Sequence, residues 1–170
     1  VTQGYRSVII GDYAGDSSMA NWSTIVGNLA GRKNTANGSS FFGSSAGENN
    51  TTGINCFIGD NSGQANKTGT YNTFIGNYAG SYNNANHNTA LGAGALLVNS
   101  TSDNNTAIGA FTLYQNSGKA NTAIGGKWNV QKNRSDDTQS TKGRSSGKAY
   151  WSSIQKEISG VYNYLPLGLR

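Results

Sequence analysis

A glycine preceded by a large apolar residue recurs along most of the chain, and this repeat limits the fold more than any other feature. Successive anchor glycines are 16 or 17 residues apart. The segments that end on them read SVIIG, STIVG, SSFFG, NCFIG, NTFIG, NTALG and NTAIG, with the last one present twice. The anchors, which we expect to be turn glycines, are Gly11, Gly27, Gly43, Gly59, Gly76, Gly92, Gly109 and Gly125. A fixed period indicates stacked equivalent units rather than one globular core.

Each unit is too short for a strand–helix–strand crossover, which needs a dozen or more residues besides its strands. Two short strands and two turns fit a 16-residue unit. A second glycine follows most anchors by four residues, at Gly15, Gly31, Gly47, Gly63 and Gly80. Such pairs indicate corners where positive φ or close backbone approach excludes a side chain. Asn-rich turns, such as residues 49–53 and 83–86, are expected to form side-chain ladders.

These features predict an all-β chain that folds as a parallel β-roll, or β-solenoid, of about eight coils of 16–17 residues. At an inter-strand spacing of ~4.8 Å, eight coils make a rod roughly 40 Å long. The apolar fraction of 35% and the charged fraction of 12% fit a folded, polar-surfaced β architecture better than charge-rich disorder.

Two adjacent positions in every unit are apolar. The residue before each anchor glycine is always large, and we expect these residues to form the structural core: Ile10, Val26, Phe42, Ile58, Ile75, Leu91, Ile108 and Ile124. The residue before that is also apolar, although neighbours on a strand point to opposite faces. A thin roll covers only one of the two faces, so the other needs a partner, and cyclic closure of identical chains supplies one most simply. We favour three rolls around an axis; the pattern leaves open which face is inside. The change to Ala in the last three units, at Ala90, Ala107 and Ala123, predicts narrower packing there.

The NTFIG and NTAIG segments, with Ala79 and Gly80 following one of them, resemble a known class of trimeric fibre protein. They are similar to the left-handed parallel β-roll repeats of trimeric autotransporter adhesin heads, and more so to the longer-period repeats of bacteriophage tail fibres. The resemblance covers about residues 5–126. It implies a homotrimeric fibre that carries host or surface attachment, located outside the cell, on the cell surface or on a virion.

The repeat ends after Gly126, so we divide the chain into a β-solenoid domain (residues 1–126), a basic polar linker (127–148) and a C-terminal segment (149–170). The first domain carries five basic and five acidic residues, and the net charge of +5 therefore arises in the tail. We expect a solvated linker rather than a nucleic-acid site. Apolar residues at 3-4-3-4 spacing from Trp151 to Leu165 predict a short helix that acts as a cap, a trimerisation segment or an interfacial helix. No apolar run is long enough for a transmembrane segment.

The sequence offers little catalytic equipment, and we expect no enzymatic activity, no cofactor and no metal. The single cysteine, Cys56, and the single histidine, His87, lie about two coils apart. Cys56 is expected to be a buried or half-buried residue, and His87 a solvent-facing turn residue. The only adjacent acidic pair, Asp136 and Asp137, falls in the linker, where no convergence of two carboxylates is indicated.

The predicted function is therefore a structural or adhesive fibre module. Exposed aromatic residues, Tyr13, Tyr78, Tyr82 and Tyr114, are candidates for contact with a glycan or another cell-surface receptor, with packing between coils as the alternative. A second hypothesis is a structural filament subunit that associates end to end. A third is ice binding through the aligned residues Thr24, Thr73, Thr89, Thr106 and Thr122, which a freezing-hysteresis assay without activity would exclude.

Overall fold

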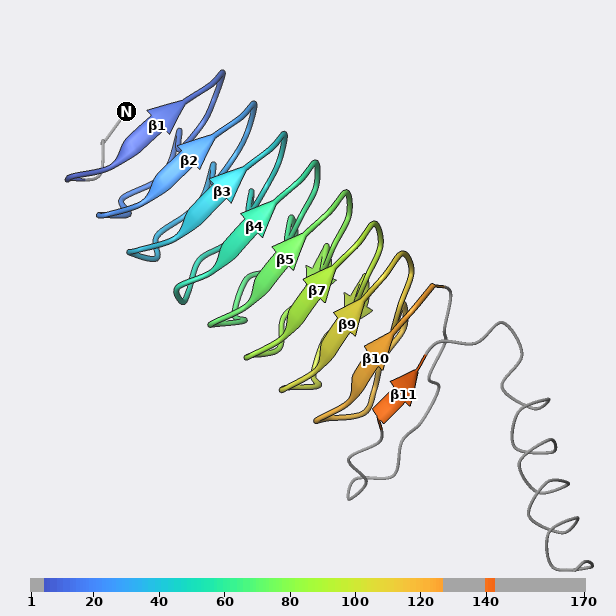
Figure 1. Cartoon of the computed structure of the whole chain (residues 1–170). Helices are drawn as coiled ribbons and strands as arrows, with labels where there is room; N and C mark the ends of the chain where they lie inside the picture. Colours follow the sequence, from blue (N-terminus) through green and yellow to red (C-terminus); the bar gives the residue numbers. More distant parts are fainter. Residues whose placement is uncertain (1–4, 127–139, 143–170) are drawn as a thin grey trace, which may run out of the picture.

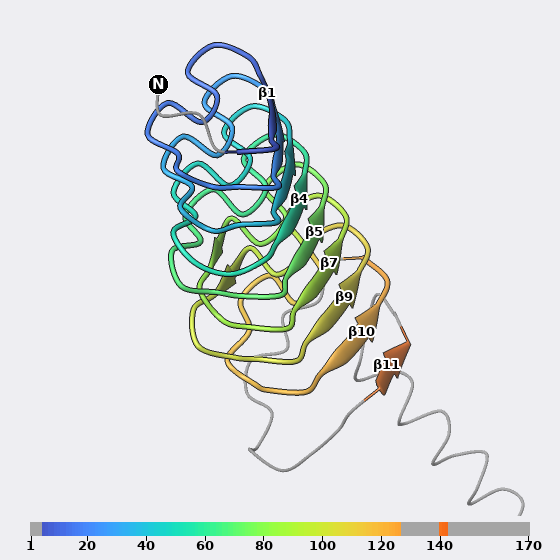
Figure 2. The ribbon, with the colours of Figure 1, turned by 90° about the vertical axis from the view of Figure 1, so that its left-hand side faces the viewer.

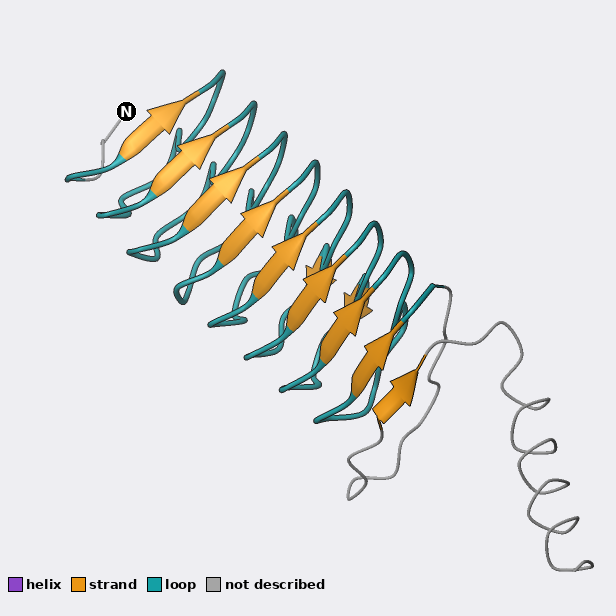
Figure 3. Cartoon of the chain, viewed as in Figure 1, coloured by secondary structure: helices purple, strands orange, loops and turns teal. Residues whose placement is uncertain are grey.

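The computed structural model describes residues 5–126 and 140–142, which form a parallel β-solenoid (Figure 1). Its main sheet contains β1 (Val8–Ile10), β2 (Thr24–Val26), β3 (Ser40–Phe42), β4 (Cys56–Ile58), β5 (Thr73–Ile75), β7 (Thr89–Leu91), β9 (Thr106–Ile108), β10 (Thr122–Ile124) and β11 (Ser140–Lys142), in that order. A smaller sheet pairs β6 (Tyr82–Asn83) with β8 (Val98–Asn99). The described residues contain strands and loops but no helix (Figure 3). The predicted all-β parallel solenoid is confirmed.

The strand of each coil lies directly over the equivalent strand of the coil before it. Phe57 pairs with Phe74 and Ile58 with Ile75, and the same unshifted register continues from β1 to β10. We number the coils 1 to 8 by their strands β1, β2, β3, β4, β5, β7, β9 and β10; seven turns connect these eight strands. The 17-residue units place their extra residue in loops, and the strand pairing is therefore unaffected.

The anchor glycines are required by the way the coils stack. All eight have φ between 121° and 138°, a conformation that side chains rarely allow. A methyl group on Gly59 would lie 2.6 Å from the carbonyl carbon of Gly76 in the next coil. Because the clash is with backbone, no side-chain rotation relieves it. The prediction that these residues are turn glycines is confirmed.

The interior of the roll is lined by the middle residue of each main-sheet strand. These inner residues are fully buried in coils 2 to 7, and they are Ile25, Phe41, Phe57, Phe74, Ala90 and Ala107. The three phenylalanines form a continuous stack, with ring centroids 5.2 Å apart between Phe41 and Phe57 and 5.0 Å between Phe57 and Phe74. Stacked rings and aliphatic side chains make one narrow core that runs along the rod.

The inner residue in each of coils 1 to 7 faces the residue four positions after the anchor glycine, and the volumes of these two residues compensate for each other. A methyl group on Gly63 would lie 2.5 Å from the Phe57 ring, so a large inner residue needs glycine across the roll. In coils 6 and 7 the inner residue is small and the residue facing it is large. The inner residues are Ala90 and Ala107, and the position of the second glycine is taken by Leu96 and Leu113, both fully buried. These leucines offset the narrower packing that the alanines alone predict.

A ladder of Ser and Asn side chains stabilises the corner just before the main sheet. Each side-chain oxygen accepts a hydrogen bond from the backbone N–H at the same position in the next coil. The Oδ1 atoms of Asn55 and Asn72, for example, accept from the N–H groups of Asn72 and Asn88, each at 2.8 Å. The ladder runs through Ser7, Ser23, Ser39, Asn55, Asn72, Asn88, Asn105 and Asn121. The oxygens of this ladder therefore satisfy buried backbone donors from coil to coil.

The predicted core is wrong in one respect, because the residues before the anchor glycines point out of the roll. Ile10, Phe42 and Leu91 are 59%, 40% and 43% exposed. Ile58 and Ile124 are also exposed, while Val26, Ile75 and Ile108 are half-buried. Side chains alternate along a three-residue strand, so only its middle residue faces inward. The core is therefore one position earlier than predicted.

Among the described residues, the opposite side of the roll forms strands only in coils 5 and 6, with a further bridge from Val98 to Gln115 (Figure 2). Coils 1 to 4 use turns there, although backbone hydrogen bonds still join them, as from Lys33 N–H to the Glu48 carbonyl at 2.9 Å. Two strands per coil were expected, and only coils 5 and 6 have them. Within the predicted linker, β11 adds one strand beside β10. The predicted C-terminal helix lies outside the described residues.

Candidate functional site

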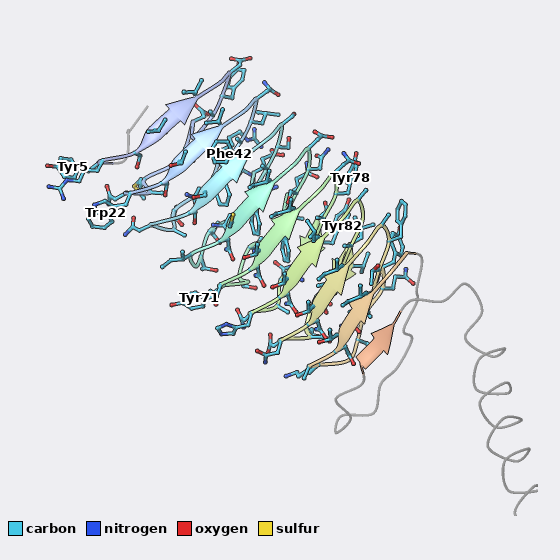
Figure 4. The ribbon with its side chains drawn as sticks, viewed as in Figure 1. Tyr5, Trp22, Phe42, Tyr71, Tyr78 and Tyr82 are labelled. Atoms are coloured by element: carbon cyan, nitrogen blue, oxygen red, sulfur yellow. The ribbon has the colours of Figure 1, made fainter. Side chains whose placement is uncertain are left out.

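The outward side of the main sheet, here called the sheet face, is a regular surface that runs through all eight coils. Each strand presents its first and third residues there, because these flank the inner residue. The third-residue column is the apolar set that precedes the anchor glycines. Phe42 lies on this face at β3 (Figure 4). Eight aligned apolar side chains exceed the scattered exposure that soluble proteins usually show, and such patches mark interaction surfaces.

The first-residue column of the sheet face consists mainly of threonine. Thr24, Thr73 and Thr106 are half-buried, and Thr89 and Thr122 are exposed. Cys56 takes the same position in coil 4 and is half-buried, as predicted. Burial raises the pKa of the Cys56 thiol, because desolvation disfavours the thiolate. The thiol is therefore a poor nucleophile near neutral pH.

A second surface, the edge row, runs beside the start of the main-sheet strands. It consists of large side chains at the corner that leads into the strands of coils 1, 2, 4, 5 and 6: Tyr5, Trp22, Ile54, Tyr71 and His87. The same corner of coils 3, 7 and 8 carries the smaller residues Gly38, Asn104 and Ala120. Trp22 and Tyr71 are 58% and 60% exposed, and Figure 4 shows them along one edge of the roll with Tyr5. The Tyr71 and His87 rings stack with centroids 5.2 Å apart. Trp22, Tyr71 and His87 have φ near 55°, an uncommon conformation for large residues.

A third surface, the back patch, lies on coils 5 to 7 and includes the sheet of β6 and β8, which lies across the roll from the main sheet (Figure 2). It contains Tyr78, Tyr82, Val98, Phe111 and Tyr114. Tyr82 and Val98 are register partners in β6 and β8, and the rings of Phe111 and Tyr114 have centroids 5.9 Å apart. All of these side chains except the half-buried Tyr114 are exposed. The five residues therefore form one apolar surface across three coils.

Gly94 leaves the space in which the Phe111 ring of the back patch lies. Gly94 occupies the position that Tyr78 has in coil 5 and Phe111 in coil 7, and a methyl group on it would lie 2.6 Å from the Phe111 ring. The Phe111 ring therefore lies over Gly94, on the side of the coil that bears Tyr78. A larger residue at position 94 would displace the ring.

The same side of coils 1 to 4 is polar and charged. Arg32 Nη2 lies 2.8 Å from Glu48 Oε1, and the side-chain N–H of Gln64 donates to Glu48 Oε2 at 3.1 Å. Asp16 and Lys33 belong to the same region. This side of the roll is therefore divided into a charged N-terminal half and an apolar C-terminal half.

The structure brings together three of the four predicted receptor contacts. Tyr78, Tyr82 and Tyr114 belong to the back patch, whereas Tyr13 lies on coil 1, about 19 Å away at ~4.8 Å per coil. Phe111 and Val98 were not predicted, although aligning the coils places them beside these tyrosines. The same alignment would have revealed the edge row.

The described residues contain no cluster of three or more His, Cys, Asp or Glu side chains able to hold a metal ion. His87 is an exposed turn residue, as predicted, and Asp136 and Asp137 lie outside the described residues. The absence of enzymatic activity and of cofactors stays a prediction. Within residues 5–126 and 140–142 no helix meets the length and apolarity needed to cross a bilayer.

Comparison with known proteins does not identify the chain: no family model, curated protein or solved structure matches it. The resemblance to tail-fibre and adhesin repeats therefore stays a prediction from the repeat itself.

Proposed function

We propose that the chain is an adhesive or structural fibre module that forms a homotrimer of left-handed rolls and attaches to a host or surface receptor. The observation that carries this proposal is the sheet face, where an unbroken apolar column remains exposed or half-buried in the single chain. A threefold arrangement with the sheet faces at the axis buries all three columns together. It also leaves the opposite side of each roll, with the back patch, on the outside of the fibre.

The size of the sheet face sets a requirement on such a trimer. Eight strands at ~4.8 Å, each presenting about 6.6 Å of outward strand, give a projected area of roughly 250 Å². Stable interfaces bury about 800 Å² per partner, so the flanking edges have to contribute as well. The edge row, in which Trp22 and Tyr71 are 58% and 60% exposed, is an apolar surface of the kind this requires.

Light scattering of the native protein tests the proposal. We expect a mass of about 53 kDa for three chains of 17.8 kDa. A monomer would contradict it, and a stable dimer would replace the threefold arrangement with two sheet faces packed against each other. Attachment is tested separately, by binding of the labelled trimer to whole cells. The extracellular, cell-surface or virion location follows from this role, and an autotransporter adhesin head is a variant of it.

A structural filament is the alternative function, favoured by the open edge of β1. Among the described residues β1 pairs only with β2, so the other edge of β1 has no strand beside it. Such edges add strands readily. Electron microscopy separates the two functions, because discrete short rods support the attachment module and continuous fibres support end-to-end assembly.

A further inference from the structure

We propose that the back patch is the receptor site of this module and that it binds an uncharged oligosaccharide. This inference rests on the proposed attachment function and adds to it a location and a ligand class. It restricts the site to coils 5 to 7 and excludes Tyr13 of coil 1.

The first argument is the absence of charge. The chain segments that form this side of coils 5 to 7, residues 76–85, 92–102 and 109–118, contain no Asp, Glu, Lys or Arg. The equivalent segments of coils 1 to 3 contain Asp12, Asp16, Arg32, Lys33 and Glu48. Two charged features border these segments: the Asp60 carboxylate of coil 4, which accepts a hydrogen bond from Asn77 Nδ2 at 3.0 Å, and the Asp103–Lys119 ion pair. Asp60 disfavours an anionic ligand beside Tyr78, and Lys119 is already paired with Asp103, so neither feature supplies a partner for an anionic glycan. A neutral ligand loses no ionic hydration there.

The second argument is the kind of side chain present. Tyr82 is 53% exposed and stands on β6, where hydrogen bonds to β8 hold its backbone. Aromatic rings provide flat apolar faces at little conformational cost, and one face of a pyranose ring presents mainly C–H groups to such a surface. Exposed amide and hydroxyl groups lie on the same coils, at Gln115, the bridge partner of Val98, and at Ser100 and Ser117, and they can exchange hydrogen bonds with sugar hydroxyls. Apolar rings bordered by neutral polar groups match an uncharged sugar chain.

The third argument is the size of the patch. Three coils at ~4.8 Å span roughly 10 to 15 Å, which accommodates two or three sugar rings. A shallow surface of this size gives weak binding at each roll. The proposed trimer carries three copies, so attachment to a dense glycan surface gains from multivalency.

The test uses the full chain on a printed array of neutral, sialylated and sulfated glycans, followed by titration with the neutral oligosaccharide that gives the strongest signal. We expect binding to neutral glycans that changes little between low and high salt, because no ion pair contributes. Tyr82→Ala should weaken binding at least about tenfold, as loss of a central aromatic contact does. Tyr82→Phe should retain most of it, because the ring is kept.

The matched control is Tyr13→Ala, which removes an aromatic side chain of similar exposure from the charged half of the roll. We expect no change in binding. Binding only to anionic glycans, an equal loss in Tyr13→Ala and Tyr82→Ala, or capture of a surface protein without any glycan would each overturn the inference.

The two proposals fail in different ways. A trimer that attaches to cells equally well with and without Tyr82→Ala overturns the glycan site and leaves the proposed function standing. A monomer that does not attach contradicts the proposed function, whereas the array still measures the patch on each single chain.

Discussion

Placing a small residue at Phe74 and a large one at Gly80 tests how the core of the roll is packed. The hypothesis is that the combined volume of the two side chains that face each other across the interior is what must be kept. Phe74→Ala removes the last ring of the phenylalanine stack, and Gly80→Leu adds a side chain on the opposite wall. Together they reproduce in coil 5 the combination that coils 6 and 7 already contain, alanine with Leu96 and alanine with Leu113.

Each single change should be severe. Phe74→Ala deletes a fully buried ring and should destabilise the fold by about 3 to 5 kcal/mol. Gly80→Leu overlaps the Phe74 ring, since even a methyl group would lie 2.7 Å from Phe74 Cγ, and Gly80 has φ of 56°. Overpacking together with a left-handed backbone should destabilise by roughly 3 kcal/mol or more.

The double variant should be much milder than the sum of the two. The leucine introduced by Gly80→Leu would occupy the space that the ring vacates, as Leu96 does with φ of 48°. The remaining loss is the left-handed backbone of a non-glycine residue and the contact with the Phe57 ring, about 2 to 3 kcal/mol together. A favourable coupling energy of at least about 3 kcal/mol is therefore expected, at or above the upper end of the range for contacting residues.

Urea unfolding followed by circular dichroism measures the cycle. The control combines Phe74→Ala with Gly63→Leu, which changes the same residue types but places the leucine against Phe57. This mispaired variant should be at least as unstable as either single change. If the double variant with Gly80→Leu is as unstable as the sum of its single changes, volume compensation is not what organises the core.

Four further predictions follow from the same structure. Ile75→Asp alters a half-buried outward side chain, so light scattering should show loss of the oligomer while the single roll loses only about 1 kcal/mol or less. Gly59→Ala should prevent folding or lower the melting temperature by more than about 10 °C, because the added methyl group meets the Gly76 backbone. Asn88→Ala should lower the free energy of unfolding by about 1 to 3 kcal/mol in thermal unfolding, since it leaves the buried Asn105 N–H without its acceptor. Asn88→Ser should be milder, because serine occupies this ladder position in coils 1 to 3. Alkylation of Cys56 in the folded protein should be slower than that of free cysteine at about pH 8 and should accelerate only above the usual thiol pKa, because burial raises the pKa; an equal rate would contradict it.

The sequence was sufficient to predict the repeating architecture. It was insufficient to predict which strand residues face the interior of the roll and which face outward. The period and the anchor glycines have a direct structural cause, such as the contact of Gly59 with Gly76, and both were predicted. Side-chain ladders were predicted in the Asn-rich turns 49–53 and 83–86, whereas the continuous Ser/Asn ladder lies at the corner before the main sheet. The inner and outer positions of each strand are both apolar, so hydropathy does not distinguish Phe57 from Ile58. The signal that does distinguish them is the pairing of the inner residue with the second glycine. Coil 6 has Ala90 where coil 5 has Phe74, and it has Leu96 where coil 5 has Gly80. Only residues that pack in the same core need to change size in opposite directions.

The surfaces were predictable only in part for a related reason. Tyr78 and Tyr82 could be recognised as exposed aromatics because they stand in loop sequence. That Phe111 belongs to the same side of the roll follows only from the register of three coils and from the space above Gly94. Trp22 and Tyr71 align only when the residue before each Ser/Asn ladder position is compared between coils, since extra residues in the loops obscure their spacing.

The behaviour of the outer column across the repeats favours a partner on the sheet face. The inner column varies from Ile to Phe to Ala, because the opposite wall compensates within the same chain. The outer column, from Ile10 to Ile124, stays within Ile, Val, Phe and Leu in all eight coils, including those whose inner residue has shrunk to alanine. Other exposed columns are not restricted in this way: the residue after the anchor glycine is Asp12, Ser44 or Ala93 in different coils. Packing inside the roll therefore does not account for the apolar outer column, and solvent alone would not require it. A second copy of the same repeating surface would require it in every coil, since each coil then meets an identical neighbour.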